Sequence, residues 1–347
     1  MANLRNCRTL ALTSMVVALY WCATGCSTAG ARGGAENLTY EAKRPLLSLH
    51  TALRKHAESE LDAVLSDLFH SDTGTAAKAL VVYIHGRGHE PKKSFESSIL
   101  GSKNRVIEKI EQQGVLVLGV DWDSAPSFRH PVCDRPIDNA LAAGPLFARV
   151  VKGLLDHRDA HPDSWRDRKV VLLAHSMGGF VLRDAMENQG AVENIRKLFD
   201  IRVISESDVP AEGHARWLPV QPAKTTFVLS NPADRTLAQS MECDAKNKRE
   251  TGPRLGTLAA SSPSPGMPDA TYIQLAAGDR HRIFTKGGAN GNPYVCGVVH
   301  DLLNGNAPQL QPKWLAAGKL NTYAVPLKKE PGNECFKGEL ADIDSDD

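Results

Sequence analysis

Short, uninterrupted runs of apolar and β-branched residues recur along the chain. They cover residues 79–84, 115–120, 170–174, 201–204, 225–229 and 272–275. Runs without polar alternation are typical of strands buried on both faces of a parallel sheet. Between them, apolar residues three or four positions apart predict helices over 45–69, 94–113, 139–157 and 178–190. This alternation predicts an α/β fold, in which helices cover both faces of a mainly parallel sheet.

The most informative stretch, residues 169–180, joins one of these strands to its helix and reads KVVLLAHSMGGF. The strand ends in a tight corner with Ser176 at its apex, and the helical pattern starts at Gly178. This arrangement is typical of a nucleophile elbow, in which a serine side chain is held above the sheet. Ala174 stands where the motif usually has glycine, and its small side chain meets the same steric demand. The Met177 amide lies at the helix start, where it can bind an oxyanion. The alternative is that Ser176 is a plain connecting residue.

Two other strand ends carry candidate residues. The first strand runs into a glycine-bracketed loop, residues 85–89, which reads HGRGH. Glycines let backbone amides approach a ligand closely. In lipases and esterases a His-Gly loop at this place supplies the second oxyanion amide, so we expect the Arg87 amide to be a donor, with a plain turn as the alternative. Trp122 follows the next strand and is expected either to line a substrate pocket or to pack in the interior.

A serine nucleophile requires a histidine base and a carboxylate that orients it. On an α/β-hydrolase sheet these residues follow in the order serine, acid, histidine. Asp234 comes directly after a predicted strand and His300 follows the last one, so we expect Ser176, Asp234 and His300 to form the triad. Asp208, which also follows a strand, is the second-choice acid. The second-choice base is His281, which ranks lower because two arginines flank it in the sequence.

Residues 239–269 show no clear pattern and are predicted to form a long loop that borders the site. They contain no apolar lid helix, so the sequence does not support action at a lipid interface.

The N-terminus has the features of an export signal. Arg5 and Arg8 precede an apolar run over residues 10–23, which is too short to predict a membrane-spanning helix. Residues 23–28, ATGCST, resemble a bacterial lipobox, which predicts lipidation of Cys26; ordinary signal-peptidase cleavage nearby is the alternative. We therefore expect a signal peptide over 1–25, a tether over 26–44, an α/β-hydrolase domain over 45–338 and an acidic tail over 339–347.

The cysteines agree with export. Of the seven, Cys7 and Cys22 would leave with the signal and Cys26 would carry lipid. The remainder can form disulfides in an oxidising compartment, with three possible pairings, or stay as buried thiols; they are Cys133, Cys243, Cys296 and Cys335. No C-x-x-C pair is present, so we expect no structural zinc.

The charge of the chain excludes some functions. There are 41 lysine and arginine residues against 40 acidic residues, which gives a formal net charge of +1. Without a basic excess, nucleic-acid binding is not expected. The chain has no phosphate-binding or dinucleotide fingerprint, so we expect no cofactor. His85 and His89 have a spacing seen in metal sites, but a glycine loop has no helical face to align them, so we expect no metal there either.

The motifs resemble those of the α/β-hydrolase superfamily, and within it a family of serine esterases of largely unknown substrate. The residues that carry this resemblance lie at 83–86, 120–124, 173–178, 206–209 and 230–237. The resemblance implies a Ser-Asp-His hydrolase that needs no cofactor. It does not imply a substrate.

The sequence thus predicts an exported serine hydrolase of the bacterial envelope, attached to the membrane by lipid on Cys26. It would cleave small-molecule carboxylic esters or thioesters through an acyl-enzyme on Ser176. A non-catalytic envelope lipoprotein that uses the fold as a binding scaffold, and an acyltransferase with the same triad, remain as alternatives. Acyl chain length and oligomeric state are left open.

Overall fold

The computed structural model describes part of the chain, and this part lies within one compact unit, Tyr40–Asp347. The described residues are 46–49, 57–70, 77–88, 110–111, 114–124, 133, 135–218, 226–249, 252–259, 270–275, 281, 292–316, 319 and 321–326. The predicted signal peptide, Cys26, the tether, most of the 94–113 helix, Cys335 and the acidic tail lie outside them.

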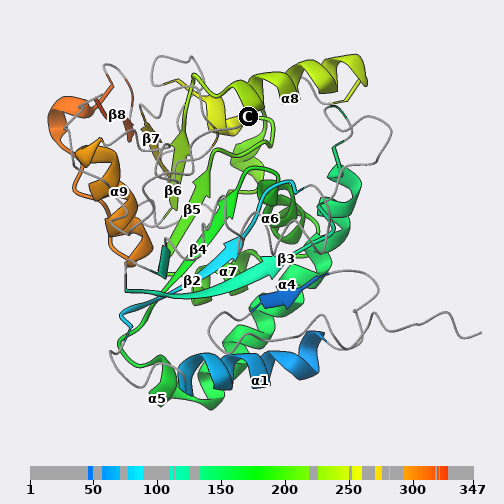
Figure 1. Cartoon of the computed structure of the whole chain (residues 1–347), viewed down its shortest axis with the longest axis vertical. Helices are drawn as coiled ribbons and strands as arrows, with labels where there is room; N and C mark the ends of the chain where they lie inside the picture. The colour runs from blue at the N-terminus through cyan, green and yellow to red at the C-terminus, as the bar shows by residue number, and fades with distance from the viewer. Residues whose placement is uncertain are drawn as a thin grey trace, which may run out of the picture. The chain divides into compact units, whose positions relative to one another are not determined.

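The described residues form an eight-stranded sheet in the order β1-β3-β2-β4-β5-β6-β7-β8, in which every neighbouring pair is parallel (Figure 1). This confirms the α/β class and the parallel sheet. The strands are β1 (Leu46–Ser48), β2 (Ala79–Ile84), β3 (Leu116–Asp121), β4 (Lys169–His175), β5 (Ile201–Ser205), β6 (Thr226–Ser230), β7 (Thr271–Gln274) and β8 (Thr322–Ala324).

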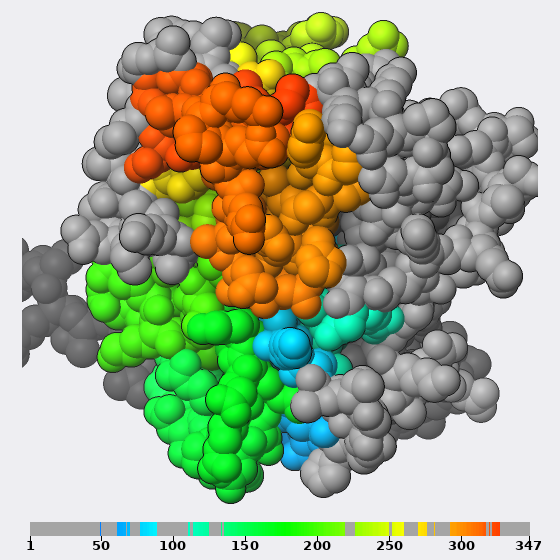
Figure 2. All heavy atoms as spheres, turned by 90° about the vertical axis from the view of Figure 1, so that its left-hand side faces the viewer, coloured from blue at the N-terminus to red at the C-terminus, as the bar shows by residue number. Residues whose placement is uncertain are grey.

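Helices cover both faces of the sheet. Figure 1 shows α9 on one side of the strands and α1 and α4 on the other, and Figure 2 views the α9 side, where α9 (orange) lies at the surface. The helices are α1 (Ala57–His70), α4 (Ile137–Ala160), α5 (Pro162–Trp165), α6 (Gly178–Glu187), α7 (Val192–Leu198), α8 (Arg235–Lys246) and α9 (Pro293–Leu303). None of these described helices is both long and apolar enough to cross a membrane.

Each central strand sends alternate side chains into two separate cores. In β2, Leu80, Val82 and Ile84 pack with α1, α4 and α6. Ala79, Val81 and Tyr83 of the same strand pack with α9. All six residues of β2 are buried. The unbroken apolar runs in the sequence therefore arise because neither face of the sheet meets water.

Two predictions of local structure are wrong, and one strand was not predicted. Residues 46–48 do not begin a helix but form the edge strand β1, which pairs with β3, and α1 starts only at Ala57. Residues 239–246, expected in a loop, continue α8. The strand β8 was not expected at all. Three-residue strands such as β1 and β8 are too short to show a periodic pattern, and their pairing with neighbours fixes them instead.

A disulfide joins Cys133 to Cys243 across 110 residues of sequence. Cys296 is also disulfide-bonded. The Cys133–Cys243 bond attaches the segment before α4 to the last part of α8.

Candidate active site

The turn that carries Ser176 has a strained backbone held in place by hydrogen bonds. Ser176 has a φ of +54°, a conformation that costs a non-glycine residue about 1–3 kcal/mol and persists only where the surroundings enforce it. Its amide donates to the Ser205 carbonyl at 3.0 Å, and its carbonyl accepts from the amides of Gly179 and Asp208, each at 3.1 Å. The side chain is therefore fixed at the end of β4, as in a nucleophile elbow.

Two glycines let the neighbouring segments approach this turn. A Cβ on Gly178 would lie 2.6 Å from the Ile84 carbonyl oxygen, which is too close for any side chain. A Cβ on Gly86 would lie 2.7 Å from Cβ and 3.2 Å from Oγ of Ser176. The loop after β2 thus passes directly against the serine. The segments that hold the expected oxyanion donors, Arg87 beside Gly86 and Met177 at the start of α6, both adjoin Ser176.

The loop after β2 is fixed by its own contacts. Nε2 of His85 lies 3.1 Å from Oδ1 of Asp121, and the Trp122 indole donates to the His85 carbonyl at 2.9 Å. Trp122 is fully buried, so it does not line an open pocket. Of the two roles expected for it, the structure supports interior packing that holds this loop.

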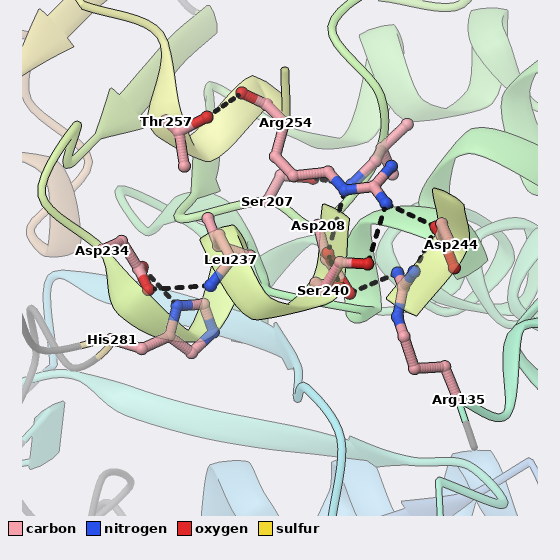
Figure 3. Close-up of polar contacts among 11 residues, drawn as sticks. Arg135, Ser207, Asp208, Asp234, Leu237, Ser240, Asp244, Arg254, Thr257 and His281 are labelled. Carbon is pink, nitrogen blue, oxygen red and sulfur yellow. Dashed lines mark hydrogen bonds and ion pairs between the residues drawn. The ribbon is translucent and has the colours of Figure 1, made fainter. Parts of the chain in front are cut away.

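Asp234 makes its contact with His281 (Figure 3). Nδ1 of His281 lies 2.6 Å from Oδ2 of Asp234. The other carboxylate oxygen accepts from the Leu237 amide at 3.0 Å, which makes Asp234 the N-cap of α8. Burial lowers the pKa of His281, but the hydrogen bond to Asp234 and the negative charges of Glu206 and Asp234 outweigh it, and the net pKa is raised.

The expected pairing of Asp234 with His300 is wrong. His300 lies within α9, and its side chain is 58% exposed with Nδ1 3.9 Å from Asp301. The helix buries Val295, Val298, Val299, Leu302 and Leu303 against the sheet, and helical geometry turns residue 300 away from that face. The second-choice histidine, His281, takes its place beside Asp234.

The second-choice acid, Asp208, belongs to a buried network of charges (Figure 3). Arg135 Nη2 donates to its Oδ2 at 2.5 Å, and Ser240 Oγ donates to its Oδ1 at 2.6 Å. Arg254 Nε lies 3.5 Å from Oδ1, and both arginines also pair with Asp244. These contacts of Asp208 therefore hold α8 and the segment before α4 at the end of β5, and its charge acts on His281 only from a distance.

Sequence reasoning missed two residues of this site, His175 and Glu206. Glu206 follows β5, is fully buried and has a φ of +45°. Its Oε2 lies 3.4 Å from Nε2 of His175, and the His175 ring is centred 4.9 Å from the ring of His281. Burial, and then the proximity of His281, lower the pKa of His175 despite the Glu206 contact. The sequence did indicate Glu206 in one respect, because it directly follows a predicted strand. The same position after a strand made Asp208 a candidate.

The sequence matches no family model and no curated protein. Among solved structures, the fold of this chain is similar to that of the mature form of the lipase BlEst2 of Bacillus licheniformis. The TM-score is 0.33 and the sequence identity is 14%, and the match covers 62% of this chain and 88% of the lipase chain. So distant a likeness says nothing about activity. The fold class follows from the structure itself. The sheet is parallel with the strand order β1-β3-β2-β4-β5-β6-β7-β8, and a strained turn with Ser176 follows its central strand β4. The chain therefore has the α/β-hydrolase fold.

Proposed function

We propose that this protein is a serine hydrolase that cleaves carboxylic esters or thioesters, with Ser176 as nucleophile, His281 as base and Asp234 as the residue that orients the base. The observation that carries the proposal is the Asp234–His281 pair, whose histidine ring lies against the ring of His175, the residue before the strained turn of Ser176. A histidine fixed by a carboxylate and a serine fixed by its backbone are the two parts that acyl transfer requires.

The contacts of His281 support its role as base. Asp234 occupies Nδ1, and Nε2 is buried without a hydrogen-bond partner among the residues that the structure describes. Nε2 is therefore the nitrogen available to take a proton. The nearby carboxylates of Asp234 and Glu206, which raise the pKa of His281 against the effect of burial, also stabilise the imidazolium that forms during the reaction.

The reaction proceeds in two halves. Ser176 Oγ bonds to the acyl carbon while its proton passes to Nε2 of His281, and the amides of Arg87 and Met177 stabilise the oxyanion. The bond to the alcohol or thiol then breaks, and the leaving group takes the proton from His281. In the second half, water gives its proton to His281 and attacks the acyl-enzyme. Release of the acid returns the proton to Ser176.

Labelling with a fluorophosphonate tests this assignment. We expect a single adduct that maps to Ser176 and is lost in Ser176→Ala. His281→Ala should slow labelling by about 10²–10⁴-fold, which is the usual contribution of a general base. His300→Ala is the matched control and should label at the wild-type rate. A folded protein that forms no adduct would favour the binding-scaffold alternative, and a loss of labelling only in His300→Ala would overturn the choice of base.

We further propose that the protein is exported and carries lipid on Cys26. The Cys133–Cys243 disulfide and the bonded state of Cys296 support an oxidising compartment. Growth of an expressing bacterium with an alkyne fatty acid should label the wild-type protein but not Cys26→Ser. Equal labelling of both proteins, or an unlabelled wild-type protein, would contradict lipidation at this residue.

A further inference from the structure

Three side chains with metal-binding atoms meet beside Ser176, from segments that are far apart in the sequence. His175 ends β4, Glu206 follows β5, and His281 lies beyond β7. One ligand atom from each lies within 4.8 Å of the others. Nε2 of His175 and Oε2 of Glu206 are 3.4 Å apart, close to the roughly 3.3 Å that separates two ligands of tetrahedral zinc with bonds of about 2.0–2.2 Å.

The surroundings of His281 resemble those of a metal-bound histidine. Its Nδ1 is held by the Asp234 carboxylate at 2.6 Å, and its Nε2 is buried without a hydrogen-bond partner in the described part of the chain. Histidines that bind metals generally direct the second ring nitrogen to a carboxylate, which fixes the tautomer and raises ligand basicity. Asp234 therefore supplies the outer partner that such a site needs.

We propose that His175, Glu206 and His281 form a binding site for Zn²⁺ that reversibly switches the enzyme off. Two imidazoles and a carboxylate are a ligand set suited to zinc, whereas Mg²⁺ and Ca²⁺ prefer oxygen ligands only. Bound zinc occupies the lone pair of His281 Nε2, so this nitrogen no longer accepts the proton of Ser176. This inference rests on the proposed function for its effect on turnover, but not for the binding itself.

Binding is tested in the Ser176→Ala variant, so that the result does not depend on catalysis. Calorimetry of the metal-free, tag-free protein should show one equivalent of Zn²⁺ bound, with no comparable heat from Mg²⁺. Glu206→Gln should weaken binding by at least about tenfold, because even outer partners of metal ligands contribute about 10–100-fold. Glu212→Gln, an exposed glutamate in the segment after β5, is the matched control and should bind as before. No saturable binding, or equal loss in both variants, would overturn the site.

The effect of zinc is tested by labelling of Ser176 in the otherwise wild-type protein, with each protein compared with itself in chelator. Zn²⁺ should slow fluorophosphonate labelling, and chelator should restore it. The ratio of the two rates should approach one in His175→Asn but not in His300→Asn, whose histidine is exposed. If zinc binds while labelling continues unchanged or accelerates, the switch is overturned. If no protein labels in chelator, the proposed function fails, and the calorimetry still decides the metal site.

Discussion

Asp234 and Asp208 both follow strands of the sheet, yet their surroundings assign them different roles. Asp234 holds His281 and caps α8, whereas Asp208 is enclosed by Arg135, Arg254 and Ser240. Neutralising the two carboxylates in turn should therefore separate catalysis from stability.

Asp234→Asn should lower kcat/KM for an ester by about 10³–10⁴-fold, because the amide no longer holds His281 in the required tautomer. The fold should be retained, since asparagine is also a good N-cap. Steady-state hydrolysis and urea unfolding measure the two effects. A variant that keeps wild-type turnover would remove Asp234 from the mechanism.

Asp208→Asn should act on stability instead, because it leaves the buried arginines without one of their compensating charges. Breaking a buried ion pair from one side costs about 3–5 kcal/mol, which we expect as a fall in the free energy of unfolding measured in urea. The activity of the folded fraction should change much less than in Asp234→Asn. A larger fall in kcat/KM than in stability would indicate that Asp208 acts on the base.

The partner of Asp234 shows where sequence reasoning fails at this scale, because the structure places His281 and not His300 beside it. Ser176 and Asp234 were located because each stands at the end of a recognisable strand. His281 ranked below His300 because Arg280 and Arg282 flank it, and neighbouring cations disfavour an imidazolium. In the structure the negative charges that raise its pKa belong to Asp234, Glu206 and Asp208, which lie far from it along the chain, so no local pattern reveals them.

At the scale of elements, α8 connects the candidate site to the buried charges. Its N-cap is Asp234, and near its other end Cys243 forms a disulfide while Asp244 pairs with Arg135 and Arg254. The disulfide therefore holds the segment before α4 against the helix that Asp234 caps. Sequence indicated α8 poorly because its apolar positions are few, and its packing depends on these ion pairs.

Replacing both Cys133 and Cys243 by serine should lower the free energy of unfolding by about 2–4 kcal/mol, the typical contribution of a disulfide that closes a long loop. Urea unfolding of the double variant measures this effect more cleanly than a reductant, which also reaches the disulfide of Cys296. The network of Arg135, Asp208, Arg254 and Asp244 should keep α8 in place, so labelling of Ser176 should persist under native conditions. An unchanged free energy of unfolding would mean that these contacts alone fix the segment.

Across the whole molecule, the parallel sheet explains why residues so distant in sequence form one site. The carboxyl ends of parallel strands share one edge, and there the loop after β2, Ser176 after β4, Glu206 after β5 and Asp234 after β6 come together. The strand runs in the sequence were sufficient to predict this edge. They did not determine which of its side chains touch, because that depends on helix and loop packing.

Two histidines outside the site make the stability of the whole molecule depend on pH. His157 and His214 are buried, and burial is the main cause that lowers the pKa of each, with the charge of His161 adding to the effect on His157. Nδ1 of His157 accepts a hydrogen bond from the Trp165 indole at 2.9 Å, and protonation would break this bond. His214 contacts the Ala211 carbonyl and the Tyr272 hydroxyl, each at 2.5 Å.

Because the folded pKa values lie below the unfolded value of about 6.5, the unfolded chain binds more protons between them. The stabilisation from these histidines is therefore complete above about pH 6.5 and is lost as the pH falls through the folded values. We expect these two histidines to lower the free energy of unfolding, measured in urea, as the pH falls from 8 to 5.5, whereas the raised pKa of His281 acts in the opposite direction. His157→Gln, which removes one titrating group, should reduce this slope, whereas His300→Gln, at an exposed position, should preserve it. Equal slopes in all three proteins would show that His157 titrates alike in the folded and unfolded states.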